Sequence, residues 1–346
     1  MNKRFSYLVK LVICLALVVG VSTAAFGDDF YRGKTIRLIV GFSPGGGFDT
    51  YTRLIARHLG KHVPGNPTTL VQNMTGAGSM IAANYMYNRA KPDGLTIANF
   101  HGSLALQQVL GGKGIQFDIR KFDWLGVPVQ GSSACALTTA SGITSMNKWF
   151  AAKEPVKLGG TAPGGTTSDI PRILKAALGL PIQLVEGYGG TANIRLAAEG
   201  GEVAGGCWQW ESIKATWRKG LESGEVKVVL QALPKKHPEL PDVSNAIDYA
   251  KSDDARLLIK LGIHDPSAIT RYYSLPPGVP RDRVIVLQKA FMETLRDPKL
   301  LEEAKRSNLD LDPLTGQQVK EIIDGMLGLK PDVVAKLKEV LVPKKL

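Results

Sequence analysis

Hydrophobic and polar positions follow two patterns along the chain, one typical of strands and the other of helices. From Thr35 onward, short runs rich in β-branched residues alternate with stretches that repeat apolar residues every three or four positions. The first series contains the strand-like runs "TIRLIVGF", "TTLVQN" and "LTIANF" and the helix-like stretches "YTRLIARHL", "SMIAANYMYNRA" and "LALQQVL". Repeated strand–helix units predict a parallel sheet flanked by helices.

A second series follows the region around Trp124. Its strand-like runs are "ACALTT", "VKLGGT", "IQLVEG", "VAGGCW" and "VKVVLQ", with helix-like stretches such as "TSDIPRILKAAL" and "TANIRLAAE". This pattern predicts a second α/β unit. The turn-rich stretches 117–133 and 264–282 suit crossings between the units, and the chain beyond Pro280 is predicted to be helical.

Residues 1–27 have the pattern of a secretory signal peptide. The segment has a basic start, followed by the apolar run "LVKLVICLALVVGVSTAA" and then small residues, so we expect cleavage near Gly27 and export into a soluble compartment. A retained membrane anchor is the alternative, but the apolar run is short for one. A lipoprotein site at Cys14 is weaker still, because a bulky residue precedes it.

Composition and charge narrow the class of protein. A chain of 346 residues that is 44% hydrophobic suits one or two globular domains. The formal net charge is +12, and loss of Lys3, Arg4 and Lys10 with the signal would leave about +9. The cations are scattered and form no basic block interleaved with aromatic residues, so we expect no nucleic-acid partner. Attraction of a small anion is the remaining interpretation.

Two glycine-rich turns share one form. Residues 43–49 read "SPGGGFD" and residues 162–169 read "APGGTTSD", and each follows a strand-like run and opens a helix. Free backbone N–H groups and the positive end of the helix dipole make such a turn receptive to an anion. One turn per unit predicts two opposed half-sites. Chance similarity between common Pro-Gly-Gly turns is the plainer alternative.

Catalytic and cofactor motifs are incomplete in this sequence. The first glycine turn lacks the Gly-Lys-Ser/Thr of a phosphate-binding loop, and "GAGSMIA" at 76–82 is only a partial dinucleotide fingerprint. Ser103 and Ser168 lack a G-x-S-x-G elbow and evident catalytic partners. His58 and His62 have the helical spacing of zinc ligands, but the glycine and proline beside them favour a polar helix end. We expect no cofactor, no metal and no catalytic residue.

Asp49 and Asp169 each stand in the first turn of a predicted helix. They could act as general bases, but this position favours a structural role, in which the carboxylate accepts free N–H groups and complements the dipole.

Cys135 and Cys207 are the cysteines that remain after cleavage of the signal. One pair in so large a protein is not a disulfide framework, although a bridge between them stays open. Two buried free thiols are the more ordinary case, and we favour that interpretation.

Several ordered segments make the chain resemble the Bug family, the extracytoplasmic solute receptors of tripartite tricarboxylate transporters. They are "IRLIVGFSPGGGFDTYTRLIARHL", "VQNMTGAGSMIAA", "AKPDGLTI", "APGGTTSDIPRIL", "EGYGGTANIRLAAEGGEV" and "LPPGVPRDRVIVLQKAF". Together they run from about Tyr31 to beyond Leu311. The combination of GGGFD, N-x-x-GAGS and AKPDG is more specific than any one glycine turn.

The resemblance implies a type II periplasmic binding protein fold, with two α/β lobes, each a sheet flanked by helices, and a ligand cleft between them. Residues 28–127 plus 271–346 would form lobe 1, and residues 128–270 would form lobe 2. The implied ligand is a small carboxylate held between opposed backbone loops, often through ordered water. The implied partners are the membrane permease subunits of a tripartite transporter, and we expect a monomer.

The family pattern also implies which positions contact the ligand. The predicted ligand-binding residues are Phe42, Ser43, Pro44, Gly45, Gly46, Gly47, Asp49, Gly76, Ala77, Gly78, Ser79, His101, Ser103, Gly164, Gly165, Thr166, Thr167, Ser168, Asp169, Tyr188, Gly190, Thr191 and Trp208. The chain departs from the family at Asp169, where a His is frequent, and at Asn193, where a Pro is usual. The usual dicarboxylates and tricarboxylates therefore do not transfer directly.

Trp208 and Trp210 would face the same way if "VAGGCWQW" were extended. An aromatic wall in a cleft would suit a flat carboxylate, but core packing is the interpretation we favour for this pair.

These observations predict capture without chemistry. A carboxylate that bridges both half-sites would draw the two lobes together, and the closed receptor would dock on a permease. Two other classes of function stay open. One is an exported enzyme that acts on a carboxylate ester or amide, and the other is a sensory receptor of the same fold.

Overall fold

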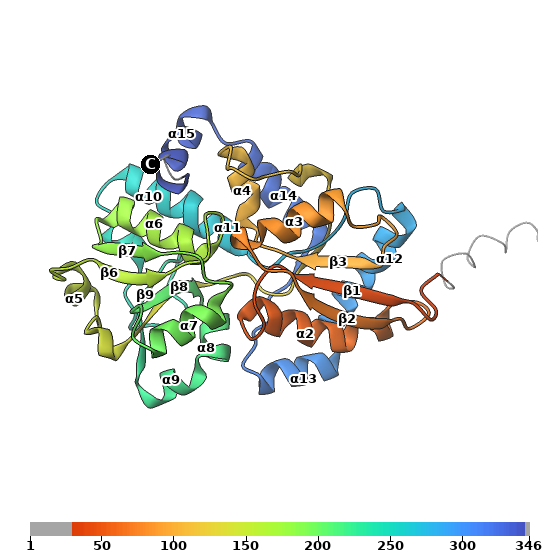
Figure 1. The fold of residues 1–346 in the computed structure, drawn as a ribbon, viewed down its shortest axis with the longest axis horizontal. Helices are drawn as coiled ribbons and strands as arrows, with labels where there is room; N and C mark the ends of the chain where they lie inside the picture. The colour runs from red at the N-terminus through yellow and green to blue at the C-terminus, as the bar shows by residue number, and fades with distance from the viewer. Residues whose placement is uncertain (1–29, 343–346) are drawn as a thin grey trace, which may run out of the picture.

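The computed structural model describes residues 30–342, so the signal peptide predicted at residues 1–27 lies outside the described residues. Two β-sheets form two lobes that lie side by side, each surrounded by helices (Figure 1). The predicted fold class of two α/β lobes is confirmed. Between residues 30 and 342, no helix combines the length and apolar character needed to cross a membrane.

The sheet of the first lobe has six strands in the order β11-β4-β10-β3-β1-β2. They are β1 (Thr35–Val40), β2 (Thr68–Asn73), β3 (Thr96–Asn99), β4 (Asp123–Val127), β10 (Tyr273–Leu275) and β11 (Leu314–Thr315). The surrounding helices are α2 (Gly47–Leu59), α3 (Met80–Asn88), α4 (Ser103–Val109), α12 (Arg281–Thr294), α13 (Pro298–Arg306) and α14 (Gly316–Leu327). β1 lies between two parallel neighbours and its last residues are buried, as the apolar run "TIRLIV" predicts.

The sheet of the second lobe has five strands in the order β7-β6-β8-β5-β9. They are β5 (Ser133–Thr138), β6 (Val156–Gly159), β7 (Ile182–Val185), β8 (Gly205–Gln209) and β9 (Val226–Gln231). The helices of this part are α5 (Met146–Phe150), α6 (Thr166–Leu178), α7 (Thr191–Glu199), α8 (Trp210–Thr216), α9 (Arg218–Ser223), α10 (Asp253–Ile259) and α11 (Asp265–Ala268). The last helix, α15 (Pro331–Leu341), contacts α6 (Figure 1).

Both sheets are mixed, whereas the sequence pattern predicted a parallel sheet for the first unit. β10 and β11 run antiparallel to their neighbours in the first sheet, and β5 runs antiparallel to β8 and β9 in the second. β5 and β10 enter their sheets after a crossing between the lobes, without the helical crossover that makes neighbours parallel. β11 follows β10 after helices α12 and α13 and runs in the same direction as β10. The stretch 117–133, predicted as a crossing, contains β4, so residues 128–132 alone connect β4 to β5.

Cys135 and Cys207 form a disulfide bond, so the favoured interpretation of two free thiols is wrong. The two cysteines lie directly opposite each other in the antiparallel pair β5–β8, with their Cα atoms 4.0 Å apart. The bond links positions 72 residues apart in sequence. Their proximity depends on strand register, which the spacing of the cysteines does not reveal.

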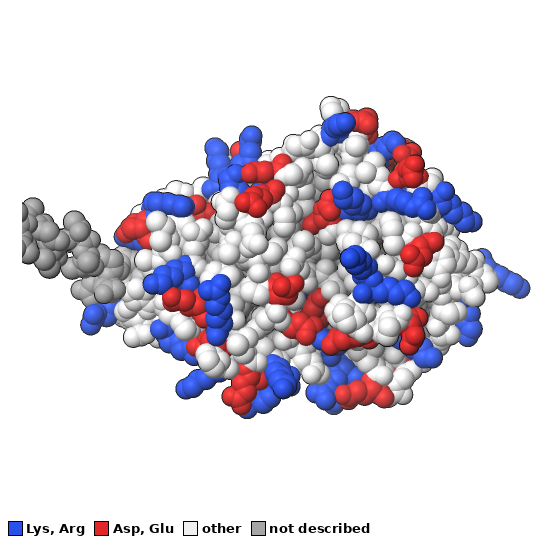
Figure 2. Space-filling view, turned by 180° about the vertical axis from the view of Figure 1, so that it is seen from behind, with Lys and Arg blue, Asp and Glu red and all other residues white. Residues whose placement is uncertain are grey.

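Charged side chains of both signs are interspersed over the face shown in Figure 2. Lys and Arg alternate there with Asp and Glu, and no continuous basic patch covers this face. The positive net charge is therefore spread over this side of the molecule.

Candidate functional site

Loops at the carboxyl ends of the strands of the two sheets meet between the lobes. The N–H of Ser43, after β1, donates to the carbonyl of Gly189, after β7, at 3.0 Å. A methyl group built on Gly46 would lie 2.7 Å from Thr191 Oγ1, and one built on Gly78 would lie 3.3 Å from Gly165 N. The two lobes are therefore in van der Waals contact along this edge, where α/β proteins commonly bind ligands.

Three helices begin at this meeting place with a glycine that offers no side-chain cap. Gly46 precedes α2, Gly165 precedes α6 and Gly190 precedes α7. No side chain of the capping residue accepts their first-turn N–H groups, and helix starts of this kind favour an anion. The first two are the turns predicted from sequence as half-sites, one in each lobe.

A small cavity of about 20 Å³ lies between these helix starts. This volume is that of roughly one water molecule. Its walls come from both lobes and are formed by Phe42, Gly46, Gly47, Phe48, His101, Thr161, Thr166, Thr167, Thr191, Trp208, Gln209, Ser212 and Arg271.

Of the predicted ligand-binding residues, the structure brings Phe42, Gly46, Gly47, His101, Thr166, Thr167, Thr191 and Trp208 together around this cavity. The other predicted residues do not line this cavity. Pro44, Gly45 and Ala77 are exposed. The hydroxyl of Tyr188 pairs with Glu202 at 2.5 Å, and Ser168 is buried beside Gly160.

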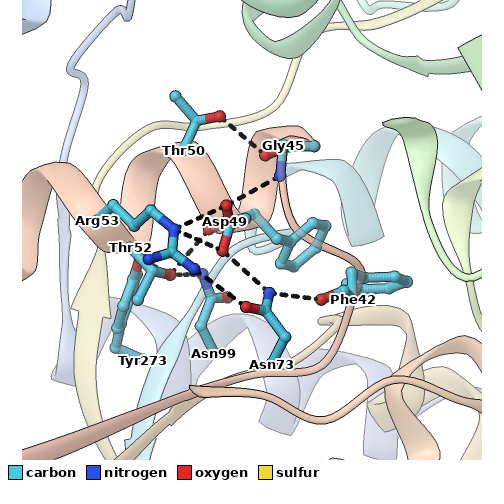
Figure 3. Close-up of polar contacts among 11 residues, drawn as sticks. Phe42, Gly45, Asp49, Thr50, Thr52, Arg53, Asn73, Asn99 and Tyr273 are labelled. Carbon is cyan, nitrogen blue, oxygen red and sulfur yellow. Dashed lines mark hydrogen bonds and ion pairs between the residues drawn. The ribbon is translucent and has the colours of Figure 1, made fainter. Parts of the chain in front are cut away.

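Asp49 fastens the first glycine turn and does not line the cavity. Its carboxylate accepts the Gly45 N–H at 2.9 Å and also pairs with Arg53 and Asn73 (Figure 3). Burial alone would raise the pKa of Asp49, but the hydrogen bonds from Arg53, Gly45 and Asn73 lower it below its ordinary value. The carboxylate therefore holds the turn in shape, as the structural interpretation predicted.

Asp169 has the same structural role in the second glycine turn. Its carboxylate accepts the Gly164 N–H at 3.0 Å, and Arg172 Nη1 lies 3.8 Å away. Here burial dominates and raises the pKa of Asp169 to about 7, against the lowering effects of the Gly164 N–H and Arg172. The two turns thus share one geometry, while their carboxylates differ in electrostatic surroundings.

His101 joins the lobes through a hydrogen bond. Its Nδ1 lies 3.0 Å from Ser103 N, and its Nε2 lies 3.0 Å from Thr166 Oγ1 and 3.2 Å from Thr166 N. Burial, together with the charge of Arg271, lowers the pKa of His101 to about 3. The imidazole is therefore neutral, and it contacts both the hydroxyl and the N–H of Thr166 at the start of α6.

The Gly-Ala-Gly turn at 76–79 contacts both His101 and the second glycine turn. Ser79 Oγ accepts the His101 N–H at 2.9 Å, and Gly78 lies against the second glycine turn. Ser79 is buried with φ at 73°, a left-handed conformation that a serine rarely adopts. This turn holds His101 in place and does not itself line the cavity.

Trp208 lines the cavity, whereas Trp210 does not. β8 ends at Gln209 and α8 begins at Trp210, so the alternation of an extended strand stops between the two tryptophans. The Trp210 Nε1 donates to Glu239 at 2.6 Å, and the Trp208 ring stacks on Trp217 with centroids 5.7 Å apart. The paired aromatic wall is therefore reduced to one ring.

Sequence reasoning missed five residues of the cavity wall, namely Phe48, Thr161, Gln209, Ser212 and Arg271. Phe48 is next to the predicted Gly47, Thr161 stands three residues before the predicted Gly164, and Gln209 and Ser212 follow Trp208. Arg271 carried no signal, because it stands in a stretch predicted as a crossing and its chain neighbours are far from the glycine turns in sequence.

His58 and His62 serve to attach α2 to α13. His58 Nε2 lies 2.8 Å from Glu303 Oε2, and His62 Nε2 lies 2.8 Å from Asp297 Oδ2. Within residues 30–342, no group of three or more His, Cys, Asp or Glu side chains is arranged to hold a metal ion.

Comparison with known proteins agrees with this geometry. A family model described as "Tripartite tricarboxylate transporter family receptor" matches residues 52–338. The solved structure of the periplasmic binding protein BugD is similar, with a TM-score of 0.74 and 20% identity over 90% of this chain and 100% of that one.

Two further solved structures of the same fold contain small acids. An R. palustris protein with adipate has a TM-score of 0.71 and 19% identity, over 90% of this chain and 99% of that one. MatC from Rhodopseudomonas palustris with bound malate has a TM-score of 0.68 and 20% identity, over 87% of this chain and 99% of that one.

Proposed function

Because the chain belongs to the tripartite tricarboxylate transporter receptor family, we propose that it captures a small carboxylate-bearing solute between its lobes and delivers it to the membrane permease of such a transporter. As a member of this family, the chain is a solute-binding receptor and not an enzyme. The relatives described above hold adipate and malate, which are both small dicarboxylates.

The observation that carries this proposal is the convergence of three glycine-capped helix starts on one cavity. α2 belongs to the first lobe, and α6 and α7 belong to the second. A carboxylate placed between them would accept N–H groups from both lobes and complement the positive ends of the helices. The predicted residues that line the cavity are those we assign to ligand contact.

Capture would proceed by closure of the lobes. A cavity of about 20 Å³ is too small for a solute of the size of malate, so the lobes must part to admit it. Contacts such as His101–Thr166 and Ser43–Gly189 join the two lobes, and they form only when the lobes approach. A ligand that bridges both sides would shift the population toward a closed form whose cavity is enlarged around the ligand, and the permease would recognise that form.

We also infer that residues 1–27 direct export to the periplasm and are removed. The Cys135–Cys207 disulfide supports this inference, because such bonds persist in oxidising compartments. BugD, which has the same fold, is a periplasmic binding protein.

Thermal unfolding of the purified protein against succinate, malate, adipate, citrate, benzoate and glutamate tests the function. Binding at 100 times the Kd stabilises the folded state by about 2.7 kcal/mol, so a ligand should raise the Tm by several degrees. Isothermal titration then gives the Kd, and mass spectrometry checks that the ligand is returned unaltered. A panel in which no carboxylate raises the Tm would contradict the proposal.

A further inference from the structure

Arg271 lies on the segment that returns from the second lobe to the first, between α11 and β10. Its side chain is only 1% exposed, and it forms part of the cavity wall. The Nε and Nη1 atoms have no hydrogen-bond partner. A buried guanidinium with unpaired N–H groups is costly, because the lost contacts with water are not replaced.

The neighbours of Arg271 surround its guanidinium but leave its Nε and Nη1 atoms without hydrogen bonds. The rings of Phe48 and Tyr51 lie 5.6 Å and 5.1 Å from the guanidinium carbon. Glu211 supplies the opposite charge, but its Oε2 is 3.9 Å from Nη1, too far for a hydrogen bond. The other oxygen, Oε1, accepts the Ser132 N–H at 2.9 Å. Glu211 thus balances the charge and leaves Nε and Nη1 of Arg271 without a hydrogen bond.

Arg271 also lies beside the start of α2. A methyl group built on Gly47 would be 3.2 Å from Arg271 Nη2. The guanidinium therefore adds a full positive charge next to the positive end of the α2 dipole, an arrangement that favours an anion at this place.

Other side chains of the cavity wall also have buried polar atoms without a hydrogen-bond partner. Trp208 Nε1, Gln209 Nε2 and Ser212 Oγ are buried without hydrogen-bond partners. Each is able to donate a hydrogen bond. The unpaired groups of the wall therefore match a ligand rich in acceptor oxygens.

From these contacts we propose that Arg271 is a ligand-binding residue that pairs directly with a ligand carboxylate at the start of α2, and that it makes the formal negative charge of that group a condition of binding. This inference rests on the proposed function. It adds an ionic contact, from a side chain on the crossing segment, to the backbone N–H groups of the helix starts.

A purely structural role for Arg271 makes a different prediction. If its task were only to neutralise Glu211, removal of both charges would restore folding and binding together. If Arg271 binds the ligand, the double variant R271Q/E211Q should fold while binding stays lost. The double variant also guards against misfolding, because R271Q alone leaves Glu211 buried and unpaired.

The test measures Kd by isothermal titration for the tightest binder of the six-acid panel and for the amide of that acid. R271Q and R271Q/E211Q should bind the acid roughly 30-fold more weakly or worse, since each loses a buried charge contact. The wild-type protein should bind the amide at least about tenfold more weakly than the acid, and this discrimination should vanish in R271Q/E211Q. R120Q, which removes an exposed Arg–Asp118 pair remote from the cavity, is the control and should bind like wild type.

Wild-type affinity in R271Q, recovery of affinity in the double variant, or equal affinity of wild type for acid and amide would each overturn this inference while leaving the proposed function intact. Failure of the wild-type protein to bind any acid of the panel would instead overturn the proposed function, and this inference with it.

Discussion

Gly46 and Thr191 begin helices in opposite lobes, yet a methyl group on Gly46 would lie only 2.7 Å from Thr191 Oγ1. This distance is shorter than a normal contact between carbon and oxygen, so any side chain at position 46 would force the Thr191 side chain to move. The glycine caps α2 and also permits the approach of α7.

The first prediction concerns this contact. G46L should abolish binding of any carboxylate that stabilises the wild-type protein, because the side chain obstructs lobe closure and covers the α2 N–H groups. The fold should survive, since the obstructing atoms belong to the other lobe. Isothermal titration measures the loss, and circular dichroism checks the fold.

A matched control for this variant is G325L on α14, where an added carbon meets nothing within 4 Å. It should bind like wild type. G165L is less informative, because a carbon on Gly165 would lie 2.3 Å from Thr161 Oγ1 within its own turn. Wild-type affinity in G46L would contradict a site between the lobes.

The second prediction concerns the hydrogen bond between His101 and Thr166. H101A should weaken ligand binding roughly 2- to 10-fold, because it removes one neutral hydrogen bond of the closed form. Since the pKa of His101 is lowered to about 3, its charge should not change between pH 5 and pH 8. The Kd of the wild-type protein should therefore show no change between pH 5 and pH 8 that reflects protonation of His101. A loss of equal size in H62A, which lies at the α13 contact, would rule out a specific role for His101.

The third prediction follows from the raised pKa of Asp169. Folded Asp169 retains its proton up to about pH 7, whereas the unfolded residue loses it near pH 4. The stability that the proton contributes is present below pH 4 and is lost as the pH rises toward 7. Compared with D169N, wild type should lose free energy of unfolding across this interval, by at most about 1.4 kcal/mol per pH unit.

Urea unfolding at several pH values measures this difference. Asp49 provides the contrast, because its lowered pKa makes wild type lose stability relative to D49N as the pH falls below about 4. Parallel pH profiles for wild type and D169N would show that Asp169 titrates normally.

The fourth prediction concerns the Cys135–Cys207 disulfide. The variant C135A/C207A should lose about 2–5 kcal/mol of unfolding free energy, since the bond closes a loop between positions 72 apart. The ligand affinity should change little, because neither cysteine lines the cavity. Two titratable thiols in the denatured, unreduced exported protein would refute the bond.

Much of the fold was predictable from local patterns. The runs "TIRLIV", "TTLVQN" and "VKVVLQ" became β1, β2 and β9 with the boundaries that their apolar residues suggest. The two glycine turns were also recognisable as helix starts, because glycine capping and strand–helix alternation are encoded within about ten residues. The mixed character of the sheets was not predictable from local patterns, because the direction of a strand depends on where the chain crosses between the lobes.

The features of the candidate site also fall into those that local sequence sets and those that tertiary packing sets. By itself, the sequence determined the glycine-capped helix starts, the placement of an aspartate in each first turn and the family to which the loops point. Only the tertiary structure decided that both aspartates face their own turns, that Cys135 lies opposite Cys207, and that Arg271 reaches the start of α2. Caps and turns depend on neighbouring residues, whereas strand register and the path of a crossing segment depend on the packing of the whole chain.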